Sequence, residues 1–349
     1  MKGNSSTGAS RSRVMLALVL TIASIAGASG TPAAQGRAPQ EGKADNAKVH
    51  LMHVQGNVYM LVEPDLNNIT VQVGETFIVI VDTGVTELSD EAIAAIQSLS
   101  DLPILFIANT SSDEDHIGGN AKFSEAGWAL PNADAPGRDP EVSAAAINAR
   151  LEPGAVIIGH TNTMSRVIVG NLAKNTSVTY GDEGSKIFNK EPVIFSHIRA
   201  AHTDGDTMVF FRGSEVVSAG ELFSPMRYPE IETEKGGSIN GEIDALNDII
   251  ALMVPKDNEE GGTYIIPGHG WLCDRNDVVN YRDMLTIIRG RIQDMVRKGM
   301  KLDQVKAAKP SFDYDPLYGA SSGPWTPDKL VETIYHEVAK DKVQQGKKE

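Results

Sequence analysis

Several short apolar runs in this chain end in turns that carry imidazole or carboxylate side chains. The side chains are Asp115 and His116, which follow residues 104–108, and then His202, Glu221 and His269 in later turns. Runs of four to eight apolar residues between turn signals are typical of buried strands. In open α/β sheets, ligands bind beyond the carboxyl ends of the strands. The pattern therefore favours an α/β fold whose strand ends carry the functional side chains.

Strand and helix signals cover most of the chain. Two hairpins are expected over residues 49–62 and 69–81, and the second ends at Asp82. Further strands are expected over 104–108, 155–158, 193–197, 207–211, 215–219 and 264–266. Helices are expected near 92–99, with Ser89 as N-cap, and near 164–172, 243–253, 275–296 and 328–339. Two halves that each combine strands with flanking helices predict a two-sheet sandwich covered by helices on both sides.

The charge balance of the 349 residues narrows the range of partners. The chain has 32 basic and 46 acidic residues, which give a formal net charge of −14. A net anion is repelled by nucleic acid and by anionic membrane surfaces, so neither is an expected partner. A small-molecule substrate stays compatible with this charge because a bound cation can reverse the local field. The single cysteine, Cys273, excludes an internal disulfide.

The N-terminal residues differ from the rest of the chain. Arg11 and Arg13 precede an apolar run over residues 14–26, and small residues follow over 27–30. This order predicts a signal peptide over residues 1–30, then a linker over 31–47, and a periplasmic or secreted protein. The alternative is a membrane anchor, but the run is shorter than the roughly 20 residues that a spanning helix needs. We expect no membrane span once the signal is removed.

The side chains at the strand ends are those that hydrolytic zinc sites use as ligands. One histidine at a strand end more often makes hydrogen bonds than binds a metal, so the joint pattern carries the argument. We expect His160 and His197 to be structural and Cys273 to be a buried thiol. Asp204 and Asp206 are expected to cap the turn after His202.

The order of these segments over residues 49–296 resembles the metallo-β-lactamase superfamily. The first motif of that family is Thr-His-x-His-x-Asp-His-x-Gly-Gly. The residues that match it here are Thr110, Asp115, His116, Gly118 and Gly119.

Four further positions carry the same resemblance. His202 lies in the family's Ala-His-Thr-x-Gly-Asp segment, and His269 lies in its Pro-Gly-His-Gly turn. Glu221 stands at the family's bridging aspartate, and Asp82 matches an early acidic position. The resemblance implies a four-layer αββα sandwich of two mixed β-sheets flanked by helices. It would comprise residues 48–297, with residues 298–349 as a C-terminal helical extension.

The chain departs from the family at one of its two metal positions. Ser111 and Asp113 stand where the first two motif histidines would be. The family's other site, which corresponds to Asp115, His116 and His269, is retained, with Glu221 as the carboxylate shared by both sites. The altered position should be richer in oxygen and less suited to zinc. We therefore expect either one tightly bound Zn²⁺, or a second ion that is weakly held or is Mn or Fe.

The resemblance implies an exported metal-dependent hydrolase. In such an enzyme a metal-bound hydroxide attacks an ester, lactone, thioester or amide, β-lactams included. Asp115 would bind metal and orient water, and Asp113 would handle a proton if neighbouring carboxylates raise its pKa. The alternative is a non-catalytic binding protein that keeps one metal as a structural pin. Two long segments, 128–152 and 223–241, are candidates for pocket walls, and the second carries Met226 and Tyr228.

Overall fold

The computed structural model describes residues 48–130, 151–167, 177–258 and 261–345, which belong to one compact unit. The predicted signal peptide and linker, and most of segment 128–152, lie outside these residues. Among the helices that the structure describes, none combines the length and apolar character needed to cross a bilayer.

The first sheet is mixed and has seven strands. Their order is β1 (His50–Gln55), β2 (Val58–Val62), β3 (Asn68–Val73), β4 (Ile78–Val81), β5 (Ile104–Asn109), β8 (Val156–His160) and β9 (Ser177–Tyr180). Strands β1 to β4 pair antiparallel, and β4, β5, β8 and β9 pair parallel. A separate two-stranded ribbon joins β6 (Trp128–Ala129) and β7 (Glu152–Pro153).

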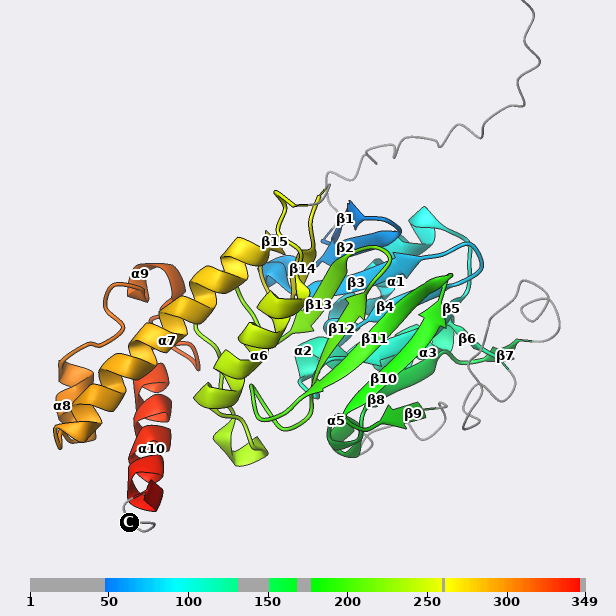
Figure 1. The fold of residues 1–349 in the computed structure, drawn as a ribbon. Helices are drawn as coiled ribbons and strands as arrows, with labels where there is room; N and C mark the ends of the chain where they lie inside the picture. The colour runs from blue at the N-terminus through cyan, green and yellow to red at the C-terminus, as the bar shows by residue number, and fades with distance from the viewer. Residues whose placement is uncertain (1–47, 131–150, 168–176, 259–260, 346–349) are drawn as a thin grey trace, which may run out of the picture. The chain divides into compact units, whose positions relative to one another are not determined.

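The second sheet has six strands and lies against the first (Figure 1). Their order is β10 (Glu183–Phe188), β11 (Glu191–Ile198), β12 (Asp206–Phe211), β13 (Val216–Gly220), β14 (Tyr264–Pro267) and β15 (Cys273–Asp274). Only the β13–β14 pair of this sheet is parallel.

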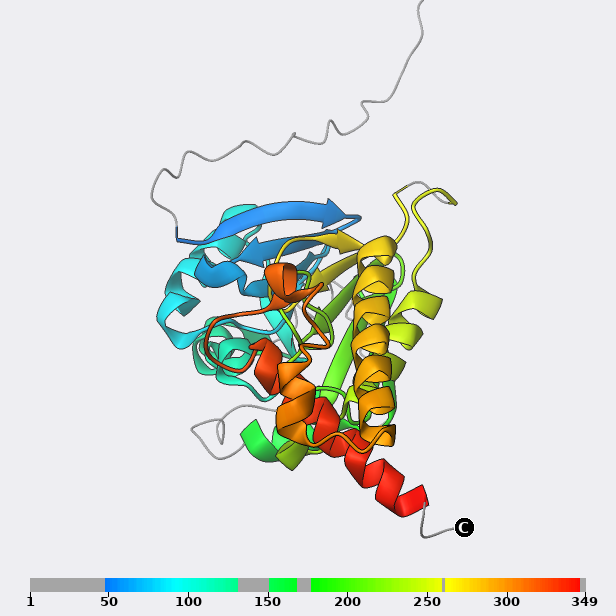
Figure 2. The ribbon, with the colours of Figure 1, turned by 90° about the vertical axis from the view of Figure 1, so that its left-hand side faces the viewer.

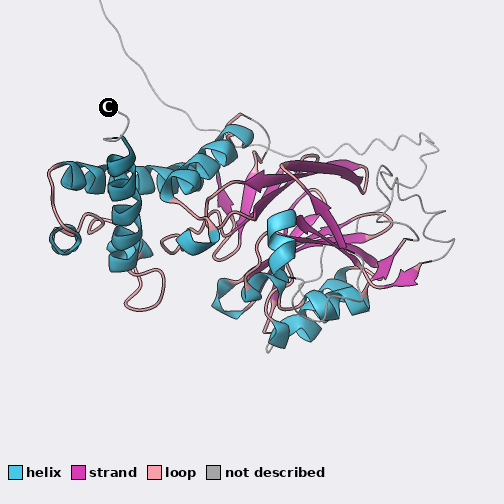
Figure 3. Cartoon of the chain, turned by 90° about the horizontal axis from the view of Figure 1, so that it is seen from below, coloured by secondary structure: helices cyan, strands magenta, loops and turns pink. Residues whose placement is uncertain are grey.

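Alternation along the strands explains the layers. In β4, Val79 and Val81 pack in the core between the sheets, whereas Ile78 and Ile80 face the helices on the outer side. Those helices are α1 (Ser89–Leu99), α3 (Asn120–Ala126) and α5 (Thr161–Val167). The outer face of the second sheet packs on α6 (Ile239–Leu252) and α7 (Arg275–Arg297). Figure 3 shows helices on both sides of the strands, and the predicted four-layer αββα sandwich of two mixed sheets is confirmed.

The C-terminal residues form helices that share the core of the sandwich. The helices are α8 (Leu302–Ala307), α9 (Asp315–Tyr318) and α10 (Pro327–Gln345). Leu330, Val331 and Ile334 of α10 are buried in the same cluster as the inner faces of α6 and α7. Figure 2 shows α10 beside the C-terminal end of α7. Residues 298–345 therefore complete the helical layer over the second sheet.

Some elements differ from the sequence expectation. Strands β9 and β10 were not expected, because the sequence of β10, Glu-Gly-Ser-Lys-Ile-Phe, is mostly polar and exposed. Ser89 is the first residue of α1 rather than its N-cap, and its hydroxyl donates to the Thr86 carbonyl at 3.0 Å. The predicted helix over 164–172 begins at Thr161, and its residues after Val167 lie outside the described part.

Parallel pairing brings the functional strand ends together. The carboxyl ends of β4 and β5 lie at one edge of the first sheet, and those of β13 and β14 at one edge of the second. Hydrogen bonds join the sheets at this edge, from Thr207 N to Thr110 O at 2.8 Å and from Asn68 N to Gly268 O at 2.8 Å. The turns that follow these strands therefore converge.

Candidate metal centre

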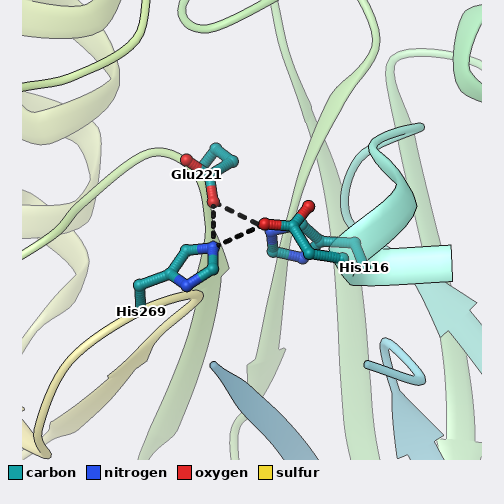
Figure 4. Close-up of side chains that lie close together, drawn as sticks. His116, Glu221 and His269 are labelled. Atoms are coloured by element: carbon teal, nitrogen blue, oxygen red, sulfur yellow. Dashed lines mark hydrogen bonds and ion pairs between the residues drawn. The ribbon is translucent and has the colours of Figure 1, made fainter. Parts of the chain in front are cut away.

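Four of the predicted ligands form one group, which we call the first cluster: Asp115, His116, Glu221 and His269. One donor atom from each lies within 4.8 Å of the others. Nε2 of His116 is 2.9 Å from Oε1 of Glu221, and Nε2 of His269 is 3.0 Å from the same oxygen. Figure 4 shows Glu221 and the two imidazole rings converging. Two nitrogen and two oxygen donors at these positions are a suitable set for Zn²⁺.

Asp82 fixes the orientation of His116. Its Oδ2 lies 2.8 Å from Nδ1 of His116, and it also accepts a hydrogen bond from the Thr110 hydroxyl at 2.5 Å. A carboxylate only accepts, so Nδ1 of His116 donates to Asp82, and Nε2 is the nitrogen that faces Glu221 and can bind a metal. A carboxylate behind a metal-binding imidazole commonly has this role. Asp82 itself has a positive φ of 61°, a conformation that is uncommon outside glycine and marks functional turns.

The Pro-Gly-His-Gly turn needs a glycine before His269. A Cβ at Gly268 would lie 2.8 Å from Cε1 of His116 and 2.8 Å from the Gly220 carbonyl. Any side chain there would push the two ligand-bearing turns apart. Gly268 thereby allows β13 and β14 to deliver Glu221 and His269 to the same point.

His269 provides a test of whether the first cluster fits a metal ion. Its Nε2 is buried and lies 3.0 Å from carboxylate oxygens of both Asp115 and Glu221. Among the described residues, that nitrogen nevertheless has no partner with hydrogen-bond geometry. A donor atom that faces two carboxylates in this way suits coordination of a shared cation. The first cluster fits a divalent metal.

The protonation equilibria of the first cluster favour added positive charge. Burial alone would raise the pKa of Glu221, but the charge of His269 and the hydrogen bond and charge of His116 lower it well below its usual value. Burial would lower the pKa of His116, yet Asp82 and Glu221 raise it well above its usual value. The pKa of His269 is also raised, because Glu221 and Asp115 outweigh the effect of burial. The carboxylates therefore stay ionised and attract positive charge. Either protons on the imidazoles or a bound metal ion can supply that charge.

The other two predicted ligands, Asp113 and His202, lie in a second cluster together with Glu232, which the sequence did not predict. Nδ1 of His202 donates to the Glu230 carbonyl at 2.7 Å, and Nε2 lies 2.7 Å from Oδ2 of Asp113. The Ser111 hydroxyl accepts the backbone N–H of Asp113 at 3.0 Å. The two substituted motif positions are thus used in hydrogen bonds within the protein.

The role of Asp113 as a proton-handling acid required a raised pKa, and the structure indicates the opposite shift. Burial alone would raise its pKa, but the hydrogen bond and charge of His202 prevail and lower it to about 2. Asp113 is therefore held as a carboxylate, and in this arrangement it is a poor proton donor.

Sequence reasoning missed four contributors to the site, all in segment 223–241. They are the carboxylate of Glu232, the ammonium of Lys235, the carbonyl of Glu230 and the guanidinium of Arg227. Nη2 of Arg227 lies 3.9 Å from Oε1 of Glu221, and its Cζ stacks 3.9 Å from the ring centroid of Trp325. The only available signal was the length of this loop after Glu221, because no short motif marks these residues.

The same segment is anchored to the C-terminal part of the chain. Tyr228 is buried, and its hydroxyl donates to Oδ1 of Asp315 at 2.9 Å. Tyr281 of α7 donates to the Arg227 carbonyl at 3.0 Å. Tyr228 therefore points away from the first cluster and anchors the loop to Asp315, whereas the neighbouring Arg227 extends to Glu221 of the first cluster.

The side chains expected to have structural roles make contacts within the protein. His160 and His197 stack on each other with ring centroids 3.5 Å apart. Asp206 caps its turn by accepting the Thr203 N–H at 2.9 Å. Cys273 is buried, and its thiol donates to the Trp271 carbonyl at 3.3 Å.

Comparisons with known proteins agree with this geometry. The sequence-family model of the metallo-beta-lactamase superfamily matches residues 62–252. A stereoselective inverting sec-alkylsulfatase from Pseudomonas sp. is similar in structure, with a TM-score of 0.56 and 13% sequence identity over 83% of this chain and 50% of that one. A double mutant of a sec-alkyl sulfatase gives a TM-score of 0.58 with the same identity and coverage.

A metallo-beta-lactamase from Pontibacter korlensis has a TM-score of 0.49 and 11% identity over 68% of this chain and 99% of that one. The chain spans about half the length of the alkylsulfatase. At these identities, the alkylsulfatase structures support the fold alone. No protein of curated function matches the chain.

Proposed function

The chain belongs to the metallo-β-lactamase superfamily, and from this premise we propose that it is a hydrolase of small molecules that uses one divalent metal ion. Asp115, His116, Glu221 and His269 would hold the ion. The observation that carries the proposal is the convergence of their four donor atoms, with Asp82 orienting the ring of His116 so that Nε2 faces the others. When bound there, a divalent ion supplies the Lewis acidity that activates water and stabilises a developing oxyanion.

The protein side chains would have distinct roles in the reaction. Asp115 is the most exposed of the four, with 39% of its side chain accessible, so it can orient an attacking water and accept its proton. Arg227 brings a fixed positive charge beside Glu221, where it can attract an anionic group of the substrate. The candidate substrates are esters, lactones, thioesters and amides, with sulfate esters added because a sec-alkylsulfatase shares the fold.

A panel of chromogenic esters, lactones, thioesters, sulfate esters and β-lactams tests the proposal, with Zn, Mn or Fe added to metal-free protein. We expect metal-dependent turnover of at least one substrate class, and its loss in His269→Ala. His336→Ala is the matched control, because His336 is exposed on α10 away from both clusters. Turnover that survives in His269→Ala would contradict the role of the first cluster.

The second candidate function is a non-catalytic binding protein in which the metal is a structural pin. The observation that favours it is the pairing of Asp113 with His202, which occupies the side chains of the second cluster. The two candidates differ in one measurement. A structural pin would raise the melting temperature on metal addition without turnover of any class in the panel.

We also propose that the protein is exported, on the basis of Arg11, Arg13 and the apolar run over residues 14–26. Fractionation of cells that express the full chain should recover a shortened protein outside the cytoplasm. Recovery of the uncleaved chain in the cytoplasm would contradict export.

A further inference from the structure

We propose that the ammonium of Lys235 takes the place of a second metal ion in the second cluster. Three donor residues meet there, and together they have the composition of a metal site. The cation that they hold in this protein is a side chain of the same chain. The inference rests on the proposed function only in assuming that the first cluster binds a metal.

The ammonium contacts both carboxylates of the second cluster. Nζ of Lys235 lies 2.5 Å from Oε2 of Glu232 and 3.6 Å from Oδ1 of Asp113. Both carboxylate side chains are partly buried, with 24% and 23% of their surface exposed. A single exposed ion pair contributes little, but one cation shared by two partly buried anions forms a network. Lys235 thus supplies positive charge where two carboxylates would otherwise repel each other.

The backbone holds Lys235 in this position. It is the last residue of a 3₁₀ turn, η4 (Thr233–Lys235). Backbone hydrogen bonds join this turn and Glu232 before it to the turn around His202. The N–H of Glu232 donates to the His202 carbonyl at 2.9 Å, and the N–H of Asp204 donates to the Lys235 carbonyl at 2.9 Å. A Cβ at Gly237 would lie 2.1 Å from the His202 carbonyl oxygen, so the loop can approach this closely only with glycine there. The backbone of the loop therefore places Lys235 beside the carboxylates of the second cluster.

The remaining donors of the second cluster are also occupied. His202 uses Nδ1 on the Glu230 carbonyl and places Nε2 against Asp113, while the Ser111 hydroxyl caps the Asp113 N–H. Among the described residues, this cluster contains one imidazole, and both of its carboxylates already share a cation. A second divalent ion would have to displace the ammonium and would meet its repulsion. The residues of the second cluster do not fit a second metal.

Metal content and binding, read without any assay of activity, test the inference. Metal-free protein is titrated with Zn²⁺ and with Co²⁺, and bound metal is measured by elemental analysis and by the visible spectrum of Co²⁺. We expect one equivalent in the parent protein. In Lys235→Met we expect a second equivalent to bind at least tenfold more tightly than it does to the parent, because the repulsive cation is gone.

Two control variants accompany Lys235→Met. Lys235→Arg keeps the positive charge and should still bind one equivalent. Lys190→Met removes an exposed lysine in the turn between β10 and β11, where it pairs with Glu75 at 2.6 Å outside the second cluster, and it should also bind one equivalent. Circular dichroism confirms that each variant is folded before metal is added.

The outcomes separate this inference from the proposed function. Two tightly bound equivalents in the parent protein would overturn the role of Lys235 and leave the proposed hydrolase intact. A single equivalent in folded Lys235→Met would overturn it as well. Absence of any bound metal in the parent would overturn the proposed function itself. If Lys235→Met does not fold, Lys235→Gln, which also removes the charge, takes its place in the titration with the same expected outcomes.

Discussion

Nδ1 of His116 lies 2.8 Å from Oδ2 of Asp82, and this contact decides which nitrogen of the ring faces the other ligands. Asp82 follows β4 and His116 lies beyond β5, so the parallel pairing of these two strands creates the contact. The orientation is therefore a property of the fold and precedes the arrival of any ion.

The contact predicts the effect of Asp82→Asn. Asparagine tolerates the positive φ at this position, but its amide is a weaker partner for Nδ1 of His116. We expect the dissociation constant for Zn²⁺ to rise about 10- to 100-fold. Competition with a chromophoric chelator measures it, and Asp90→Asn, an exposed acid on α1, serves as the control. Unchanged affinity would show that the contact does not support the ligand.

Metal removal should lower stability, because a ligand that binds only the folded state stabilises it by mass action. Free metal at about 1,000 times its dissociation constant contributes about 4 kcal/mol, and we expect the melting temperature to rise by about 10 °C. A thermal scan with and without chelator measures the shift. The shift should disappear in His269→Ala and persist in His336→Ala. An equal shift in both variants would place the metal elsewhere.

The positive charge of Arg227 should weaken metal binding at the first cluster, although the same charge is proposed to attract an anionic group of the substrate. Its Nη2 is 3.9 Å from Glu221, and its Nε and Nη2 have no hydrogen-bond partner among the described residues. Removing this charge in Arg227→Met should tighten metal binding by about 1 kcal/mol, or about fivefold, because one repulsive cation is lost. Chelator competition measures the change. Arg227→Lys keeps the charge and should stay close to the parent, whereas weaker binding in Arg227→Met would refute the argument.

Glu242 predicts a pH dependence of stability. It is fully buried in α6, and its two carboxyl oxygens have no hydrogen-bond partner among the described residues. Burial raises its pKa well above the usual value, and the charge of Asp206 adds to the effect. The folded state therefore keeps a proton that the unfolded chain releases above a pH of about 4.3, so this residue lowers stability as pH rises toward its folded-state pKa.

Glu242→Gln removes that titration. Urea unfolding at pH 5 and pH 8 should show that the variant gains stability relative to the parent as pH rises, by about 1 kcal/mol or more. Asp244→Asn, at an exposed position of the same helix, is the control. A difference between variant and parent that does not change with pH would mean that Glu242 keeps an ordinary pKa.

Much of the sandwich could be predicted from sequence because its strands are buried and apolar. Strand β5 reads as a continuous apolar run that ends at Asn109, and α7 begins at a capping box between Asp274 and Asp277. Strand β10 was missed because it is a polar strand on the sheet edge, held by pairing with β11 rather than by its own burial. Local pattern carries no information about such pairing.

The site shows the same division. Asp115, His116, Glu221 and His269 follow strand ends in a recognisable order, so their grouping could be anticipated. Lys235 could not, because its role depends on a loop that returns to the His202 turn. The lowered pKa of Asp113 was missed for the same reason, since it follows from the direction in which Nε2 of His202 points.

The stack of Arg227 on Trp325 and the hydrogen bond from Tyr228 to Asp315 join the loop beside Glu221 to residues made late in synthesis. During translation, all four residues of the first cluster leave the ribosome before the residues that brace this loop. The nascent chain thus lacks the support of its finished pocket, so the proposed metal ion would bind in the final geometry only to the completed polypeptide. With the proposed export of a chain that is still unfolded, that timing would put metal acquisition after translocation, where the ions of the destination compartment would determine which metal is bound.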